Sequence, residues 1–192
     1  MPDNTCWIDT IDYDEAGPEL RSVFDQVLGP DGQLDNLYRA FSLRGHTILP
    51  ADDLYKAVLH HGDNTLSKRF SELLGCYVAI LTGCDYALAH HGHNFVHLSS
   101  DSDHAQGILS ALRLDRTEAC GDAREVAALD YTRKLCRFPE DVSKSDVEAL
   151  RDAGWVDGEV LEIVQVVAMF SYFTRVINGV GIALGNEKLG LY

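Results

Sequence analysis

The sequence predicts an all-α, multi-helix bundle, because apolar residues recur at helical spacing in most segments and no two segments read as a convincing strand pair. A chain of 192 residues with 46% hydrophobic content can bury one core. We therefore expect a single domain over residues 1–192, with a helical lead-in at 1–61 and a core at 62–192. A helix-hinge-helix unit is expected at both 66–97 and 143–184, which indicates a possible divergent internal repeat.

Three helices are predicted in the lead-in. The first begins near Pro18 and ends before Gly29, the second covers 34–41, and the third follows Pro50 and runs to about His61. The first is supported by apolar residues on one helical face, namely Leu20, Val23, Phe24, Val27 and Leu28.

The centre of the chain carries the strongest helical pattern. Residues 66–81 are apolar on nearly every side, which is typical of a buried helix. Thr82 and Gly83 interrupt this helix, and a new one is expected to start at Cys84. The polar segment SSDSDHAQG, residues 99–107, is predicted to be a loop or a helix boundary.

Three polar residues are expected to open the helices of the second half. A helix that Asp122 caps should run to about Arg137, and one that Ser143 caps should end at Gly154. Asp157 opens a long helix through the run VLEIVQVVAMFSYF. This run is rich in β-branched residues, but its length and its lack of a two-residue period favour a buried helix.

Charge and composition limit the partners that we expect. A net charge of -14 disfavours nucleic acid and anionic membrane surfaces, which bind clustered Lys and Arg. The first residues do not resemble a signal peptide, so a cytoplasmic location is expected. The longest apolar stretch contains Glu162, Gln165 and Arg175, and this polarity argues against a transmembrane helix.

The chain has five cysteines, an odd number that argues against a framework of structural disulfides in a chain without an export signal. Cys76, Cys120 and Cys136 lie within or beside helical patterns. Packing as small buried residues is their expected role.

The candidate chemical centre is the group Glu72, Cys84 and His91. Cys84, Ala87 and His91 are spaced to share one face of a helix, and Cys84 falls near that helix's N-terminus, where the macrodipole favours a thiolate. A hairpin of buried helices could return Glu72 to the same pocket. Spacing alone leaves an alternative open, in which Glu72 and His91 are solvated and Cys84 only packs.

Read as a string, Glu72-x11-Cys84-x2-Ala87-x3-His91 resembles the E-x11-C-x-x-C-x3-H motif of the alkylhydroperoxidase D-like branch of the carboxymuconolactone decarboxylase family. The text around it, TGCDYALAHHG, is similar as well. DYDEAGPELRSVFDQVLGPDGQLDNLYRAF resembles the lead-in of the longer peroxidase-related members. ALDYTRKL and VEALRDAGWVDGEVLEIVQVVAMFSYFTRVINGVG resemble their C-terminal half.

The resemblance implies an all-helical fold, homo-oligomers, no cofactor, and reduction of small hydroperoxides by a cysteine pair, with Glu72 and His91 relaying protons. In typical members the second cysteine attacks the peroxide, and here that position is Ala87. Cys84 could then act alone, oxidised to a sulfenate and reduced by an external thiol or dithiol, or by Cys76. The expected activity is that of a peroxidase-type oxidoreductase with impaired or altered turnover.

Two further interpretations rest on the same residues. On the decarboxylase side of the family, Glu72 and His91 would act as acid and base, without a thiol or a cofactor. The carboxylates of such a substrate would need a cationic residue, and Lys68 and Arg69 are the nearest candidates. Alternatively, the chain is an oligomeric scaffold that has lost its activity, which predicts an unreactive Cys84.

A metal site is the weakest alternative. His90, His93 and His97 recur along one side of a helix and could hold zinc or nickel. No carboxylate or cysteine ligand lies beside them in the sequence, so a solvated helix face is the expected explanation, and no metal is predicted.

Overall fold

The computed structural model describes residues 5–29 and 32–190, and their regular structure is helical, without a β-strand. The predicted all-α class is confirmed. Residues 1–4, 30–31 and 191–192, which belong to the predicted domain and its lead-in, lie outside the described residues.

The α-helices of the described residues are α1 (Pro18–Phe24), α2 (Asn36–Ala40), α3 (Ile48–His60), α4 (Lys68–Leu81), α5 (Asp85–His97), α6 (Ser102–Arg113), α7 (Ala123–Arg137), α8 (Lys144–Asp152) and α9 (Asp157–Val180). Short 3-10 helices cover Tyr13–Glu15, Ser42–Thr47, Thr117–Ala119 and Pro139–Asp141.

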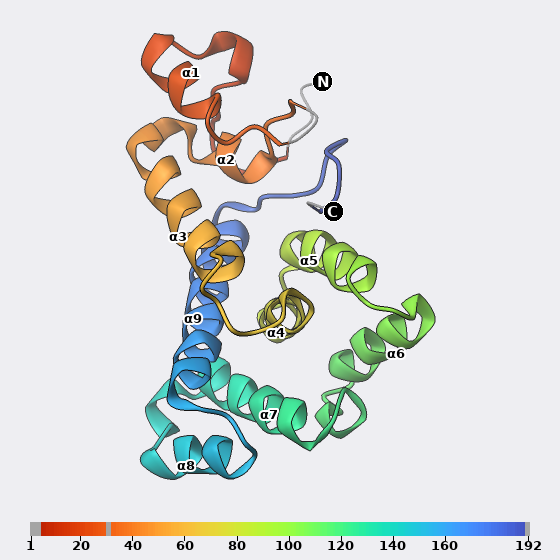
Figure 1. Ribbon diagram of the computed structural model, residues 1–192. Helices are drawn as coiled ribbons and strands as arrows, with labels where there is room; N and C mark the ends of the chain where they lie inside the picture. The colour runs from red at the N-terminus through yellow and green to blue at the C-terminus, as the bar shows by residue number, and fades with distance from the viewer. Residues whose placement is uncertain (1–4, 30–31, 191–192) are drawn as a thin grey trace.

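Helix α4 lies at the centre of the core. Figure 1 shows it nearly end-on, with α9, α7, α6 and α5 arranged around it, and all four, together with α3, pack against it. Every residue from 70 to 79 is buried, as the apolar pattern predicted. A carboxylate in this stretch must therefore find its partners inside the protein.

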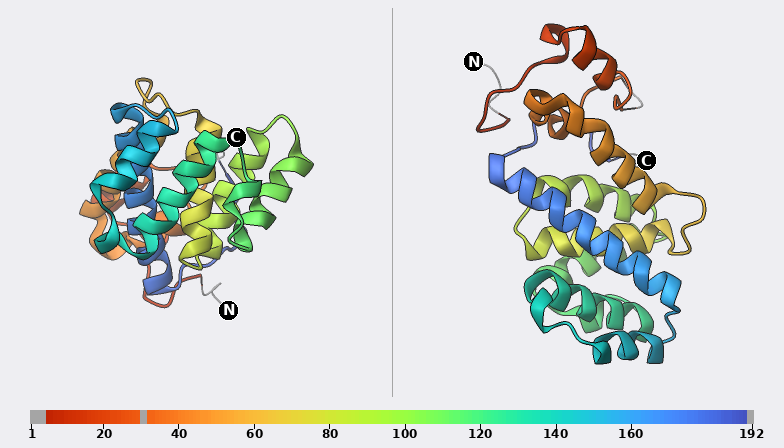
Figure 2. Two further views of the ribbon diagram at one scale, coloured as in Figure 1. Left: turned by 90° about the horizontal axis from the view of Figure 1, so that it is seen from below. Right: turned by 90° about the vertical axis from the view of Figure 1, so that its left-hand side faces the viewer.

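Helix α9 crosses the bundle as its longest element, running diagonally past α4 and α5 in the right-hand view of Figure 2. By length and composition alone it could span a membrane, with a mean hydropathy of 1.6 and half of its most apolar stretch buried. It approaches α4 closely at Gly75, where an added Cβ would lie 2.2 Å from Cζ of Phe170. Its buried half packs against α3, α4 and α7, as expected of a core helix.

The lead-in helices cover one end of the bundle (Figure 2). The first helix ends earlier than predicted, at Phe24, because the chain continues with tighter hydrogen bonds, from Gln26 N–H to the Val23 carbonyl and from Val27 N–H to the Phe24 carbonyl. The backbone of residues 5–7 is tied to the end of α9 by the bond from Trp7 N–H to the Val180 carbonyl, at 2.8 Å.

The secondary structure of the polar segment 99–107 was only partly predicted. Its boundary lies at Asp101, whose side chain accepts from the backbone N–H groups of Asp103 and His104, and α6 follows directly. Residues 102–107 are thus helical. The buried side chains that hold α6 lie mostly beyond the polar segment, at Ile108, Leu109 and Leu112 among others.

The helix starts predicted in the second half are confirmed. Asp122 accepts from the Glu125 N–H at 2.9 Å, and Ser143 begins α8 with its N–H donating to the carboxylate of Asp146 at 2.7 Å. The internal repeat stays a prediction. Its first unit pairs helices of 14 and 13 residues, whereas its second pairs helices of 9 and 24.

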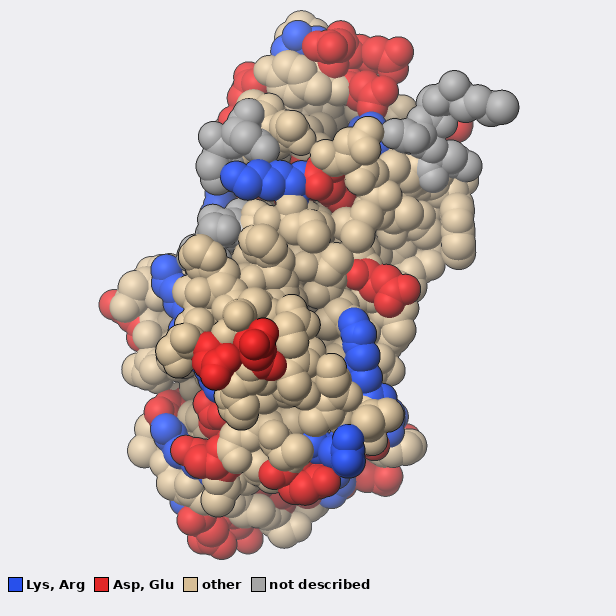
Figure 3. Space-filling model, turned by 90° about the vertical axis from the view of Figure 1, so that its right-hand side faces the viewer, with Lys and Arg blue, Asp and Glu red and all other residues tan. Residues whose placement is uncertain are grey.

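Acidic and basic side chains alternate on the face that Figure 3 shows, where no single basic patch forms. Ion pairs elsewhere in the described residues likewise neutralise basic side chains, such as those of Arg133 with Asp130 and of Lys134 with Asp146. This face therefore lacks the clustered positive charge that phosphate backbones select.

Candidate active site

Glu72 and His91 meet in the core, on α4 and α5. Glu72 is only 2% exposed, and its Oε2 lies 2.7 Å from Nδ1 of His91. Its Oε1 accepts a hydrogen bond of 3.0 Å from Nδ2 of Asn94, one turn after His91. Both carboxylate oxygens thus have partners, which a carboxylate at this depth requires.

This arrangement fixes the tautomer of His91. Because Nδ1 faces a carboxylate, it carries a proton, and in the neutral ring Nε2 is then the basic nitrogen. The ring stands edge-on to Phe170, with centroids 4.5 Å apart, and also contacts Tyr55. Aromatic contacts and a hydrogen-bonded carboxylate are what hold a histidine in one orientation for proton transfer.

His91 lines a cavity of about 200 Å³ between α5, α9 and the lead-in. Its wall is mostly apolar, and Ala87 and Asn94 lie beside His91 on the α5 side. The apolar lining includes Val27, Leu37, Tyr55, Met169, Phe170, Phe173 and Ile177. A small apolar molecule in this space would meet His91, whereas Glu72 lies behind the imidazole.

Cys84 lies at the helix N-terminus, as predicted, but not at the wall of the cavity. It is the N-cap residue of α5, is 1% exposed and is not among the residues lining the cavity. Burial raises the pKa of its thiol, although hydrogen bonds from the backbone of Ala87 and Tyr86 act in the opposite direction. The helix N-terminus was expected to favour a thiolate, but at this site desolvation is the larger effect.

Cys76, Cys120 and Cys136 are buried as predicted, and Cys6 is buried as well. Burial, with the nearby Glu72 carboxylate, raises the pKa of Cys76 well above its ordinary value, which makes Cys76 a poor nucleophile or resolving thiol.

The three histidines of the weak metal alternative lie in different surroundings. His90 contacts Glu187 and Gly190, whereas His93 and His97 line a hollow on another side of α5. Within the described ranges, no group of three His, Cys, Asp or Glu side chains could hold a metal ion.

The cation that the decarboxylase interpretation needs is not found where it was expected. Arg69 pairs with Glu125 at 3.2 Å, and neither Arg69 nor Lys68 lines the cavity. Among the described residues of the cavity wall, Lys56 is the one Lys or Arg, and its ammonium lies 2.6 Å from Oδ2 of Asp52.

Several cavity residues were missed by the sequence analysis. Asn94 could have been found, since it lies three residues after His91 and so on the same helix face. His60 on α3 also lines the cavity, and its ring contacts Tyr55 with centroids 5.0 Å apart. Burial lowers the pKa of His60. No local pattern distinguishes it from the solvated His61, because only the packing of α3 sets its direction.

Searches against protein-family models and curated proteins give no match. Solved structures do match. A peroxidase-related protein from Ralstonia eutropha JMP134, described as an alkylhydroperoxidase AhpD core, has a TM-score of 0.80 at 19% identity, over 95% of this chain and 93% of that one. A peroxidase-related protein from Silicibacter sp. TM1040 has a TM-score of 0.80 at 23% identity, over 96% and 94%.

A third similar structure is a cysteine-to-alanine variant of the debrominase Bmp8 in complex with 2,3,4-tribromopyrrole. Its TM-score is 0.67 at 17% identity, and the match covers 88% of this chain and 87% of that chain. At these identities the likeness establishes the fold. The chain has the AhpD-like helical fold of peroxidase-related proteins.

Proposed function

We propose that this chain is an enzyme of AhpD-like fold in which His91, supported by Glu72, transfers a proton to or from a small, mainly apolar molecule. The observation that carries the proposal is the buried pair itself, 2.7 Å from Oε2 to Nδ1, with His91 at the wall of the cavity. When Nε2 takes a proton, the carboxylate stabilises the resulting imidazolium. No cofactor is needed for this step.

Position 87 favours chemistry without a thiol. In the resembling motif the second cysteine attacks the substrate, and the corresponding residue here is Ala87, which lines the cavity beside His91. The remaining thiol, Cys84, is buried outside the lining, and its pKa is raised. An acid-base reaction therefore uses the groups that a bound molecule can reach.

The cavity favours a substrate without several carboxylates. Asp35 and Asp52 line it, and Lys56 is already paired with Asp52. A polyanionic lactone would meet excess negative charge. A neutral aromatic carbon acid suits the rings of Tyr55, Phe170 and Phe173, and the debrominase of the same fold was solved with a small aromatic ring.

The test uses 5-nitrobenzisoxazole, a neutral aromatic probe of bases in apolar pockets. A base removes the proton from the ring carbon beside nitrogen. The C–H electron pair completes a nitrile, and the N–O bond breaks to release a coloured nitrophenolate. We expect His91→Gln to reduce kcat/KM by about 10²-fold or more, and Glu72→Gln to reduce it less.

Cys84→Ser is the matched control, and it should retain the activity of the parent because the thiol takes no part in this reaction. A parent protein that is no faster than His91→Gln would contradict the proposal.

Hydroperoxide reduction at Cys84 is the second candidate. It is supported by the backbone hydrogen bonds from Ala87 and Tyr86, which favour the thiolate, and by the peroxidase-related proteins of the same fold. The thiolate would attack the outer peroxide oxygen, the O–O bond would break, and His91 would protonate the departing alkoxide. An external thiol would then condense with the sulfenic acid to a mixed disulfide and water, and a second thiol would release the Cys84 thiol as the external disulfide forms.

Trapping with dimedone separates the two candidates. After treatment with a small hydroperoxide, a dimedone adduct located at Cys84 by mass spectrometry would support the peroxidase. If there is neither an adduct nor turnover of the benzisoxazole, the chain is an inactive scaffold.

A further inference from the structure

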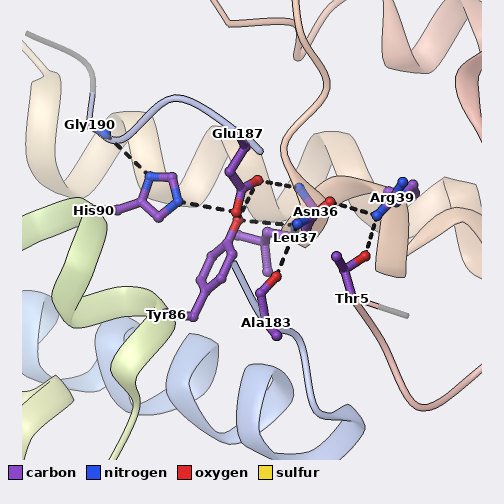
Figure 4. A network of polar contacts seen from close by, with 9 residues as sticks. All are labelled: Thr5, Asn36, Leu37, Arg39, Tyr86, His90, Ala183, Glu187 and Gly190. Carbon is purple, nitrogen blue, oxygen red and sulfur yellow. Dashed lines mark hydrogen bonds and ion pairs between the residues drawn. The ribbon is translucent and has the colours of Figure 1, made fainter. Parts of the chain in front are cut away.

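The C-terminal tail, residues 183–190, is fixed to the bundle through Glu187 (Figure 4). The side chain of Glu187 is 5% exposed. Its Oε2 accepts from the Asn36 N–H at 2.8 Å and from the Tyr86 hydroxyl at 3.3 Å, and its Oε1 lies 3.4 Å from Nε2 of His90. One carboxylate therefore joins the tail to α2 and α5.

Gly190 forms the second attachment of the tail. Its N–H donates to Nδ1 of His90 at 3.3 Å, and its φ of +75° lies in the region that favours glycine. A Cβ at this position would lie 2.4 Å from Oδ1 of Asn94 and 2.6 Å from Cδ2 of His93. The backbone of the tail thus rests directly on α5, at a distance that only glycine permits.

These attachments lie at the wall of the cavity. Gly190 lines the cavity, and so do its partner His90 and the Glu187 partner Tyr86. Asn94, on which Gly190 rests, also donates to Glu72. The tail therefore closes the cavity beside the proposed acid-base pair.

The tail differs from the rest of the wall in how it is held. Helices α3, α5 and α9 pack against other helices, whereas the end of the tail is held by the polar contacts of Glu187, the close contact of Gly190 with α5 and one partly buried apolar side chain, Leu189. Segments with few apolar contacts and many polar ones open at low free-energy cost.

We propose that the C-terminal tail, anchored by Glu187 and seated through Gly190, sets the length of the molecules that the cavity accepts. The tail is a specificity-determining wall, and displacing it extends the cavity beyond α5. This inference rests on the proposed function only in taking the cavity as the substrate site.

Direct binding of 4-alkylphenols, from 4-methylphenol to 4-octylphenol, tests the inference by isothermal titration calorimetry. Gly190→Ala prevents the close contact of Gly190 with α5, and Glu187→Ala removes the polar contacts of the Glu187 carboxylate. The control is Asn186→Ala, an exposed neighbour in the same tail. Far-UV circular dichroism establishes that each variant keeps the helical fold.

For the parent and the control, affinity should rise about fourfold with each buried methylene and then stop rising at one chain length. For Gly190→Ala and Glu187→Ala, the rise should continue past that length, giving at least tenfold tighter binding of the longest phenols. The same stopping point in all four proteins would overturn the inference. The inference would also be overturned if the two variants bound phenols of every chain length more weakly by the same factor, or if the parent showed no saturable binding. Because binding requires no proton transfer, the binding data can be interpreted even if the acid-base proposal fails.

Discussion

Cys84 and Ala87 lie one helical turn apart on α5 but in different surroundings. Ala87 borders the cavity next to His91, and Cys84 is enclosed at the N-cap. A thiol at position 87 would be reachable from the cavity and close to an imidazole that can accept its proton. The identity of this one residue therefore decides whether the cavity presents a nucleophile.

Ala87→Cys should create a thiol that iodoacetamide alkylates at least about tenfold faster than Cys84. The variant should also gain dithiol-dependent peroxide consumption, because Cys84 can close a local disulfide with it. Peptide mass spectrometry and steady-state peroxide assays measure the two effects. Adding Cys84→Ser should abolish the turnover but keep the labelling. If the 84–87 disulfide forms without any gain in turnover, the peroxidase interpretation should be abandoned.

His60 should make the stability of the fold depend on pH. Burial is the largest cause of its lowered pKa, with Lys68 and Lys56 acting in the same direction and Glu72 opposing them. Below about pH 6.5, the unfolded chain binds a proton at this histidine more readily than the folded one. The stability contributed by neutral His60 is therefore present above that pH and is lost as the pH falls.

Thermal unfolding at about pH 7.5 and about pH 5.5 measures this contribution. The fall in Tm between the two should be smaller in His60→Gln than in the parent, while His46→Gln, at an exposed histidine, should match the parent. An unchanged fall in His60→Gln would show that this site does not contribute.

At the level of helices, the contact between α4 and α9 links stability to the site. Gly75 lies against the ring of Phe170, and the same ring contacts His91. The spacing of the two helices therefore fixes the orientation of the imidazole, because protein interiors are close-packed and transmit strain.

Gly75→Ala should destabilise the fold by about 1–3 kcal/mol, since the added methyl group must displace the Phe170 ring. It should also slow benzisoxazole turnover. Urea unfolding gives the free-energy change. Gly107→Ala on α6 is the control, as nothing lies within 4 Å of its added Cβ, and it should stabilise the protein by about 0.5–1 kcal/mol. Equal effects of the two substitutions would exclude the proposed packing constraint.

For the molecule as a whole, α9 leaves a stripe of exposed side chains that is mostly apolar and also includes Gln165. Leu161 is 57% exposed and Tyr172 is 44% exposed, and the exposed Ala168 lies between them on the same helical face. Exposed apolar stripes on long core helices mark association surfaces.

We expect a homo-oligomer that uses this stripe. Light scattering should give a mass that is a multiple of 21.2 kDa, and Leu161→Lys combined with Tyr172→Lys should shift it toward the single chain. Leu114→Lys, at a similarly exposed leucine outside α9, is the control. A parent mass of 21.2 kDa at every concentration would contradict the expectation.

The sequence by itself determined the helical class and the starts of α7, α8 and α9, and it indicated Glu72 and His91 as candidates for one pocket. These depend on local signals: a 3.6-residue period, capping side chains, and a buried glutamate that must find a partner. The end of α1 and the helical residues 102–107 were less well predicted, because tight turns and tertiary packing override weak local preferences there.

Only the tertiary structure decided which groups face the cavity. Helical spacing placed Cys84, Ala87 and His91 on one side of α5, but it could not give the depth of each residue beneath its neighbours. That depth separates the enclosed Cys84 from the accessible His91. His60, from a helix distant in sequence, joins the cavity only through the packing of α3. The desolvation of a side chain is a property of everything packed around it, and for this reason no local pattern encodes it.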